Sequence, residues 1–271
     1  MYKRQGYYDT DSGDGYTSVS PKRMIDSRPA PNRVGPLGAW GPGVVQDVAV
    51  TGGTTGVPSN ATAVVVNMTV TGGTANGDYL SVWPSGGAMP SVSSINMNAG
   101  QTVASQVTVK VGTTGSHAGK ISVFNAGGTQ QVITDIVGYF QAGAGKAFHP
   151  RGTSRLFDTR PPPSHRGPYY PWGPGSTQTV PIAVDDVVPP EAESVILNVT
   201  VTGGDAPTDY LTVWPAGLAR PLASSLNSVQ WDTIGNAVTT RVGVGASAGE
   251  IGIFNAAGTI NLIVDVSGYY A

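Results

Sequence analysis

Asp78-Tyr79-Leu80-Ser81-Val82-Trp83-Pro84 is followed much later in the chain by Asp209-Tyr210-Leu211-Thr212-Val213-Trp214-Pro215, which is almost the same string. Two further segments return at nearly the same spacing, 23–29 as 155–161 and 124–139 as 254–269. The offset between the copies changes only from 132 to 130 residues along the unit. The chain therefore contains one unit twice, and we name the copies repeat A and repeat B.

The duplication also provides an internal control for function. A residue that both repeats keep is expected to serve the fold, whereas a residue found in one repeat is free to serve local chemistry. The length of 271 residues suits two domains. We predict an N-terminal arm over 1–22, repeat A over 23–140, a flexible Gly/Ala linker over 141–154 and repeat B over 155–271.

Hydrophobic residues alternate with polar ones within each repeat, which is the period of a β-strand. Val64, Val66, Met68 and Val70 share one predicted face, and Val65, Asn67, Thr69 and Thr71 share the other. Further strands are expected in repeat A near 44–50, 79–83, 92–97, 102–111, 120–125 and 131–139. Short strands separated by glycine and proline turns predict an all-β chain with two tandem antiparallel β-sandwich domains, jelly-roll or immunoglobulin-like, and an extended N-terminal arm. No capped amphipathic helix is predicted.

Composition argues against several classes of protein. Charged residues make up 12% of the chain and the formal net charge is −2, so no nucleic-acid partner is expected. The chain has no cysteine, which removes disulfides and thiolate chemistry. No run of 18 apolar residues is present, so we expect no membrane insertion. The first residues lack the apolar stretch of a signal peptide, so either the general export route is not used or the signal has been removed.

Enzyme-like patterns are weak in this sequence. Residues 245–249 match the nucleophile-elbow pattern, but a strand is predicted after them where the elbow needs a helix. The only histidines, His117, His149 and His165, are scattered and are expected on the surface.

The aspartates of the unit recur with neighbouring arginines, which favours a structural role. We predict Arg–Asp pairs that close each sandwich, and we predict no catalytic residue. The recurring pairs are Asp26/Asp158, Asp78/Asp209, Asp135/Asp265 and Arg28/Arg160.

The N-terminal arm offers two weaker signals. Asp9, Asp11 and Asp14 resemble a calcium loop, although the third aspartate lies one residue late for its spacing, and no cofactor or metal other than calcium is expected. The arm also carries four tyrosines that could dock a partner chain, although the arm could equally fold back on its own domain. These tyrosines are Tyr2, Tyr7, Tyr8 and Tyr16.

Aromatic residues separate the two repeats most clearly. Trp40 and Trp172 recur, as do Trp83 and Trp214, and are expected in the core or in turns. Repeat B alone has Tyr169, Tyr170 and Trp231, and repeat A has Leu37 and Gly38 opposite the tyrosines. An aromatic loop suits stacking on sugar rings or packing on a protein, and the alternative is packing against Pro161–Pro163. The predicted ligand-binding set is Tyr169, Tyr170, Trp172, His165 and Arg166.

The combined motifs resemble a known family. R-[LM]-[FI]-D-[ST]-R-P, N-x-T-V-T-G-G, D-Y-L-[ST]-V-W-P, F-N-A-x-G-T and D-x-x-G-Y-[FY] look like a repeat of secreted actinobacterial proteins, often joined to cell-wall amidases and other hydrolases. Similar units appear in virion proteins of phages that infect actinobacteria. The resemblance covers about 23–140 and 155–270. It implies an accessory β-domain for surface or glycan attachment, with no catalytic residues to carry over.

Two functional hypotheses follow from these observations. The first is a non-enzymatic structural or attachment protein on the virion surface of an actinobacteriophage, in a capsid-decorating or tail-associated position. Its partners would be other virion proteins or further copies of the chain, and it could also bind host envelope glycan. The second is a secreted carbohydrate-binding module located in the cell wall, with surface polysaccharide as its ligand. The sequence fixes neither the ligand nor the oligomeric state.

Overall fold

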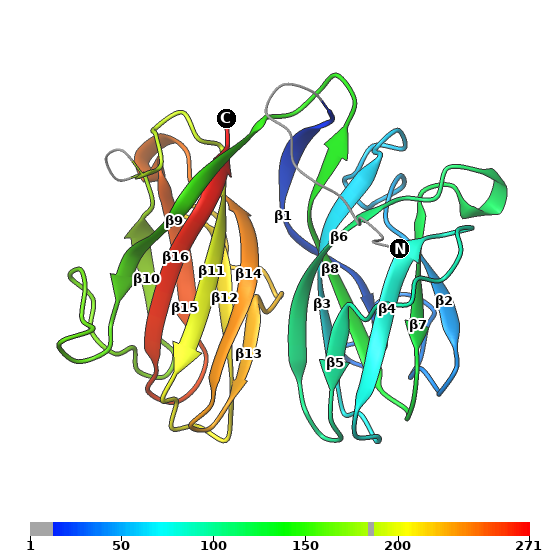
Figure 1. Ribbon diagram of the computed structural model, residues 1–271, viewed down its shortest axis with the longest axis horizontal. Helices are drawn as coiled ribbons and strands as arrows, with labels where there is room; N and C mark the ends of the chain where they lie inside the picture. Colours follow the sequence, from blue (N-terminus) through cyan, green and yellow to red (C-terminus); the bar gives the residue numbers. More distant parts are fainter. Residues whose placement is uncertain (1–12, 184–186) are drawn as a thin grey trace.

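A computed structural model describes residues 13–183 and 187–271. Each repeat folds into two four-stranded antiparallel sheets, and the two sandwiches lie side by side (Figure 1). The strands of repeat A are β1 (Gly15–Asp26), β2 (Val45–Ala49), β3 (Ala63–Thr71), β4 (Asp78–Pro84), β5 (Ile95–Met97), β6 (Val103–Lys110), β7 (Lys120–Asn125) and β8 (Gln131–Gln141). Those of repeat B are β9 (Phe148–Asp158), β10 (Thr177–Pro181), β11 (Ser194–Thr202), β12 (Thr208–Pro215), β13 (Leu226–Val229), β14 (Thr233–Arg241), β15 (Glu250–Asn255) and β16 (Asn261–Tyr270).

The strand order identifies the sandwich type. Repeat A has the orders β1-β8-β3-β6 and β2-β7-β4-β5, and repeat B has β9-β16-β11-β14 and β10-β15-β12-β13. Eight strands in two sheets of this order form a jelly roll rather than the seven- or nine-stranded immunoglobulin sandwich. The all-β tandem prediction is confirmed, and of its two variants the structure has the jelly roll. The helices of the described residues are short 3-10 turns, η1 (Gly115–His117) and η3 (Gly245–Ser247).

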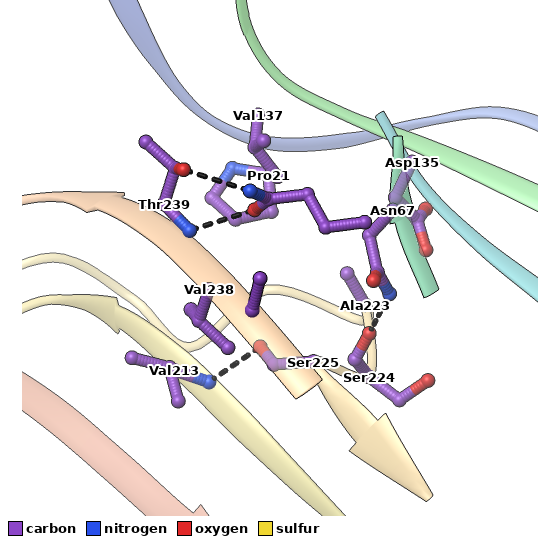
Figure 2. Close-up of a pocket in the computed structure, with 12 residues that line it drawn as sticks. Pro21, Asn67, Asp135, Val137, Val213, Ala223, Ser224, Ser225, Val238 and Thr239 are labelled. Atoms are coloured by element: carbon purple, nitrogen blue, oxygen red, sulfur yellow. Dashed lines mark hydrogen bonds between the residues drawn. The ribbon is translucent and has the colours of Figure 1, made fainter. Parts of the chain in front are cut away.

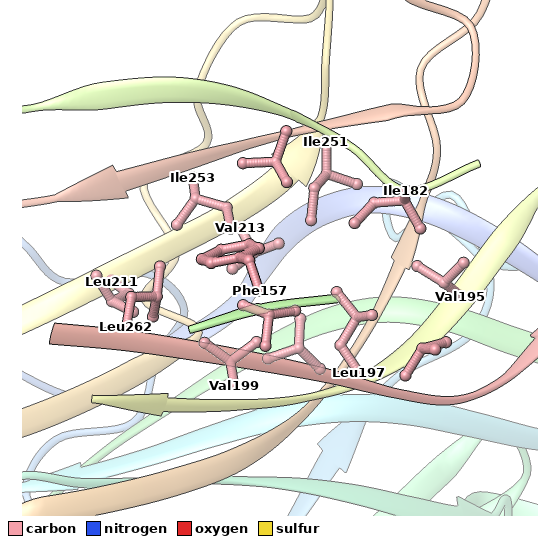
Figure 3. Packing of buried hydrophobic residues seen from close by; sticks show 14 of the residues in the cluster. Phe157, Ile182, Val195, Leu197, Val199, Leu211, Val213, Ile251, Ile253 and Leu262 are labelled. Atoms are coloured by element: carbon pink, nitrogen blue, oxygen red, sulfur yellow. The ribbon is translucent and has the colours of Figure 1, made fainter. Parts of the chain in front are cut away.

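Each sandwich has its own hydrophobic core. The predicted inward face of β3, formed by Val64, Val66, Met68 and Val70, lies in the core of repeat A. The equivalent residues of β11 lie in the core of repeat B, where Leu197 and Val199 meet Leu211 and Val213 of the opposite sheet (Figure 3). Burying such side chains contributes about 1.5–3 kcal/mol each.

The outer face of β3 is buried as well, because repeat B packs against it. Val65, Asn67 and Thr69 are only 1%, 5% and 2% exposed. The Asn67 side-chain amide donates to the backbone oxygen of Ser224 at 2.6 Å (Figure 2), and the amide of Asn236 donates to Asn67 Oδ1 at 3.2 Å. The predicted polar outer face is therefore an interface between the two repeats.

A second polar contact and an aromatic cluster complete this interface. The Gln106 amide donates to Thr239 Oγ1 at 2.8 Å and accepts from the Thr239 backbone N–H at 2.6 Å. Tyr16 stacks on Tyr270 with ring centroids 4.2 Å apart. Because these contacts join strands of both repeats, the sandwiches are packed together rather than held only by the linker.

Two predicted boundaries differ from the structure. Strand β1 begins at Gly15, so the last eight residues of the predicted arm form an edge strand of repeat A. Strand β9 begins at Phe148, so only 142–147 of the predicted linker lies outside a strand. Tyr16 and Lys146 exchange backbone hydrogen bonds of 2.9 and 2.8 Å, so this segment is paired to β1 instead of forming a free joint.

Candidate functional site

The loop between β9 and β10 holds the aromatic residues predicted for repeat B. Tyr169 is half-buried and packs its ring against Phe157, with centroids 4.9 Å apart, and edge-on to Trp172 at 6.3 Å. Burial raises the pKa of the Tyr169 hydroxyl, and the charge of Glu250 adds to this effect. Tyr169 thus anchors the loop on the core, as Leu37 does in repeat A.

Tyr170 points away from the core instead. It is 72% exposed, and its ring stacks on the His165 imidazole with centroids 5.2 Å apart and planes inclined by 25°. Arg166 is exposed beside His165, and its backbone exchanges two hydrogen bonds of 2.9 Å with Asp158. The loop therefore presents the Tyr170 ring stacked on the His165 imidazole, with the exposed Arg166 next to it in the chain, at one end of the sandwich.

Trp172 does not belong to this exposed set, which corrects the prediction. It is 1% exposed, as is its counterpart Trp40, and it packs in the core of repeat B. The amide of Asn255 donates to the Trp172 backbone oxygen at 3.1 Å, and Asn125 does the same for Trp40. Because both repeats keep the same arrangement, Trp172 serves the fold.

The predicted docking tyrosines fall into two groups. Tyr2, Tyr7 and Tyr8 lie outside the described residues. Tyr16 lies in β1, is 1% exposed and donates its hydroxyl to the Val137 backbone oxygen at 3.2 Å. Its ring is used inside this chain, at the junction of the two repeats, and so does not present a surface to another chain.

The calcium prediction is only partly visible in the structure. Asp9 and Asp11 lie outside the described residues, and Asp14 accepts a hydrogen bond from the Thr62 hydroxyl. Among residues 13–183 and 187–271, no group of three or more His, Cys, Asp or Glu side chains is arranged to hold a metal ion. The calcium hypothesis therefore stays a prediction.

The recurring aspartates and neighbouring arginines form the same cluster of ion pairs in both repeats. We call this cluster the bracket. In repeat A, Arg28 binds Asp26 through two nitrogens at 2.9 and 2.6 Å. Arg23 binds Asp135 through two nitrogens at 2.9 and 3.1 Å and also reaches Asp26 at 3.0 Å. Asp135 is thus held by a bidentate contact from Arg23, whereas the recurring Arg28 binds Asp26. Repeat B has the same contacts in Arg160–Asp158 and Arg155–Asp265.

The bracket shifts the pKa of its carboxyls in opposite directions. The hydrogen bond from Arg160 lowers the pKa of Asp158. Burial acts to raise the pKa of Asp26, but the hydrogen bonds and charge of Arg28 outweigh it and the pKa is lowered. Burial raises the pKa of Asp135 despite Arg23. These groups join two strands and a turn, which is a structural role.

Asp78 and Asp209, the remaining carboxyls that both repeats keep, each hold a turn. Asp78 Oδ1 accepts from the backbone N–H groups of Gly127 and Tyr79, both at 2.7 Å. Asp209 makes the same two bonds to Ala257 and Tyr210, also at 2.7 Å. Like the bracket, this pair serves the fold of both copies.

Repeat A has a polar cluster that sequence reasoning missed. His117 Nδ1 lies 2.9 Å from Ser85 Oγ and 3.3 Å from Asp47 Oδ2, and Ser122 donates to Asp47 Oδ1 at 2.6 Å. Both the serine and the carboxylate use Nδ1, whereas a hydrolytic triad places the serine at Nε2. The signal was present in the duplication, because repeat B replaces all four residues. The replacements are Ser247, Ala216, Thr179 and Gly252.

The nucleophile-elbow match also lacks the geometry of an active serine. Ser247 lies in the 3-10 turn η3, and strand β15 starts three residues later at Glu250. An elbow needs a strand-to-helix turn that exposes the serine above the sheet. This segment is a turn between two strands, as its sequence indicated.

The fold is similar to that of a tandem bacterial domain among the solved structures. The tandem domain CBM22-1-CBM22-2 from Paenibacillus barcinonensis Xyn10C is similar over 95% of this chain and 94% of that chain, at 10% sequence identity and a TM-score of 0.25. No protein-family model and no curated protein matches the chain. Within the described residues, no helix has the length and apolar character needed to cross a membrane.

Proposed function

We propose that the chain is a non-catalytic module that binds polysaccharide through the end of repeat B, outside the cell or in the cell wall. The observation that carries the proposal is the Tyr170 ring, which is 72% exposed and held against His165. An exposed aromatic ring presents an apolar face to a ligand, and the neighbouring imidazole and guanidinium of His165 and Arg166 can hydrogen-bond to hydroxyl groups.

The duplication supports the same proposal. Repeat A forms the same loop with Gly38 at the position of Tyr170, so the fold does not require a ring there. The carboxylates kept in both repeats are engaged by arginines or by backbone N–H groups. What distinguishes repeat B at this end is therefore surface chemistry suited to binding. The virion role stays a prediction, because Tyr2, Tyr7 and Tyr8 lie outside the described residues.

The test is binding of the purified chain to insoluble cell-wall polysaccharide from an actinobacterium. We expect Tyr170→Gly, which copies repeat A, to weaken binding about tenfold, the loss of roughly one stacking contact. Its melting temperature should stay unchanged because the ring is exposed.

Leu222→Ala is the matched control. Leu222 is 93% exposed but lies in the loop between β12 and β13, next to the repeat interface, so its removal should leave binding intact. Failure of the native chain to bind any wall fraction would overturn the proposal, and so would equal binding by Tyr170→Gly.

A further inference from the structure

Trp231 has a backbone conformation that tryptophan rarely adopts. It lies in the turn between β13 and β14 with φ of 66°, the only positive φ of a non-glycine residue in the part of the chain that the structure describes. In this region the side chain crowds the backbone, and a bulky residue is strained. Repeat A has Gly100 at the same position, with φ of 76°.

The turn itself does not need the tryptophan. The Trp231 backbone N–H donates to the Gly204 oxygen at 2.8 Å, and the Gly100 N–H donates to the Gly73 oxygen at the same distance. The side chain of Trp231 is 67% exposed. Its ring makes no ring–ring or cation–π contact within 13–183 and 187–271, so no contact of these kinds offsets the strain. The fold of repeat B gives no reason for this residue.

Trp231 lies at the same end of the sandwich as the Tyr170 loop. Three backbone hydrogen bonds connect the turns of this end: Trp172 to Ile260 at 2.9 Å, Asp205 to Thr259 at 3.3 Å, and Trp231 to Gly204. The Tyr170 loop leaves β9 at one edge of the sheet β9-β16-β11-β14, and the Trp231 turn enters β14 at the other edge. Three strand spacings separate these edges, about 14 Å.

We infer that Trp231 is a second sugar-stacking residue, and that the ligand is an extended polysaccharide lying across this end of repeat B rather than a terminal sugar. The inference rests on the proposed function and names its ligand class. The exposed residues Asp205 and Asp232 lie in turns at this end of repeat B. Asp205 Oδ1 accepts from the Thr259 backbone N–H at 2.6 Å, and the other carboxylate oxygens can accept hydrogen bonds from sugar hydroxyls. A ligand long enough to meet both rings gains both contacts.

The test uses Trp231→Gly and soluble wall-polysaccharide fragments graded by length. For the native chain, affinity should rise with fragment length until both rings are covered. For Trp231→Gly, long fragments should bind about tenfold more weakly and single sugars equally well. The melting temperature should be unchanged or higher by about 2 °C, because glycine removes the strain.

Gly100→Trp is the reciprocal control, because it places the same ring in the turn of repeat A. It should lower the melting temperature by about 2 °C and leave binding unchanged.

Two results would overturn the inference. One is equal binding of long fragments by Trp231→Gly while Tyr170→Gly loses binding, which would leave the proposed function standing. The other is a melting temperature for Trp231→Gly several degrees below that of the native chain, which would assign the ring to the fold. If the native chain binds no fragment, the proposed function fails with it.

Discussion

Asn67 in repeat A and Asn198 in repeat B occupy the same place on the outer face of the same sheet, yet their surroundings differ completely. Each is paired in register with the bracket aspartate of its repeat, Asp135 or Asp265. Asn67 is 5% exposed beneath repeat B, whereas Asn198 is open to solvent. The asparagine that both repeats keep therefore does not by itself decide whether the outer face of its sheet is covered.

The residues that differ between the two faces explain the difference. Gln106, which binds Thr239 across the interface, is replaced by Ala237 in repeat B, and Val137 is replaced by Ser267. On the opposing edge, Asn236 of repeat B takes the place of Ser105. The duplicated unit thus supplies the sandwich, and single-copy residues determine where one sandwich packs on the other. The same division is the basis on which we propose Tyr170 and Trp231 as binding residues.

The largest effect that would test this comparison is expected at the bracket arginines. Arg23→Ala leaves Asp135, whose side chain is 1% exposed, without its bidentate partner, and should lower the free energy of unfolding by about 3 kcal/mol. Arg155→Ala should cost only about 1 kcal/mol, because the side chains of Arg155 and Asp265 are 35% and 13% exposed and water can replace the lost contact. Urea denaturation measures both values. Equal losses would show that the repeat interface does not affect the bracket.

A smaller effect is expected for the asparagine pair. Asn67→Ala removes one side chain that both donates across the interface and accepts from Asn236. The variant should therefore lower the free energy of unfolding by about 1–3 kcal/mol. Asn198→Ala, the matched change on the open face, should stay within about 0.5 kcal/mol of the native chain. Calorimetry is the suitable measurement, because a weakened interface should also separate the melting of the two repeats. A larger loss of stability for Asn198→Ala than for Asn67→Ala would contradict the comparison.

The sequence predicts the local elements well because they depend on local pattern. Strand β4 was expected at 79–83 and runs over Asp78–Pro84, and β7 matches its expected limits. Strand β1 was missed because Pro21 and two register shifts interrupt its alternation. The burial of Asn67 could not be predicted, because it arises from contacts with Ser224 and Asn236, which are more than 150 positions away.

The candidate site was also predicted only in part from the sequence. Non-duplication was enough to mark Tyr170, His165 and Trp231 as residues that the fold does not require. Trp172 was assigned to the ligand even though Trp40 recurs opposite it, and the recurrence was the better guide. The left-handed conformation of Trp231 needs the structure, although Gly100 at the equivalent position was a signal for it.

The smallest expected effect concerns acid stability, where two carboxyls at different positions of the bracket, Asp158 of repeat B and Asp135 of repeat A, should respond with opposite sign. The pKa of Asp158 is lowered below the unfolded value of 3.8, so its ionised form contributes stability that is present above this pH and is lost as the pH falls through the folded-state pKa. The pKa of Asp135 is raised, so its contribution is fully present below pH 3.8 and is lost as the pH rises through the folded-state pKa.

Melting temperatures measured between about pH 3 and pH 6 test these signs. As the pH falls, the deficit of Asp158→Asn relative to the native chain should shrink, because the native chain loses the contribution that the variant never had. Over the same range, Asp135→Asn should fall further behind the native chain, which gains stability as Asp135 takes up its proton. Parallel pH profiles for the two variants would show that the burial of Asp135 does not set its titration apart from that of Asp158.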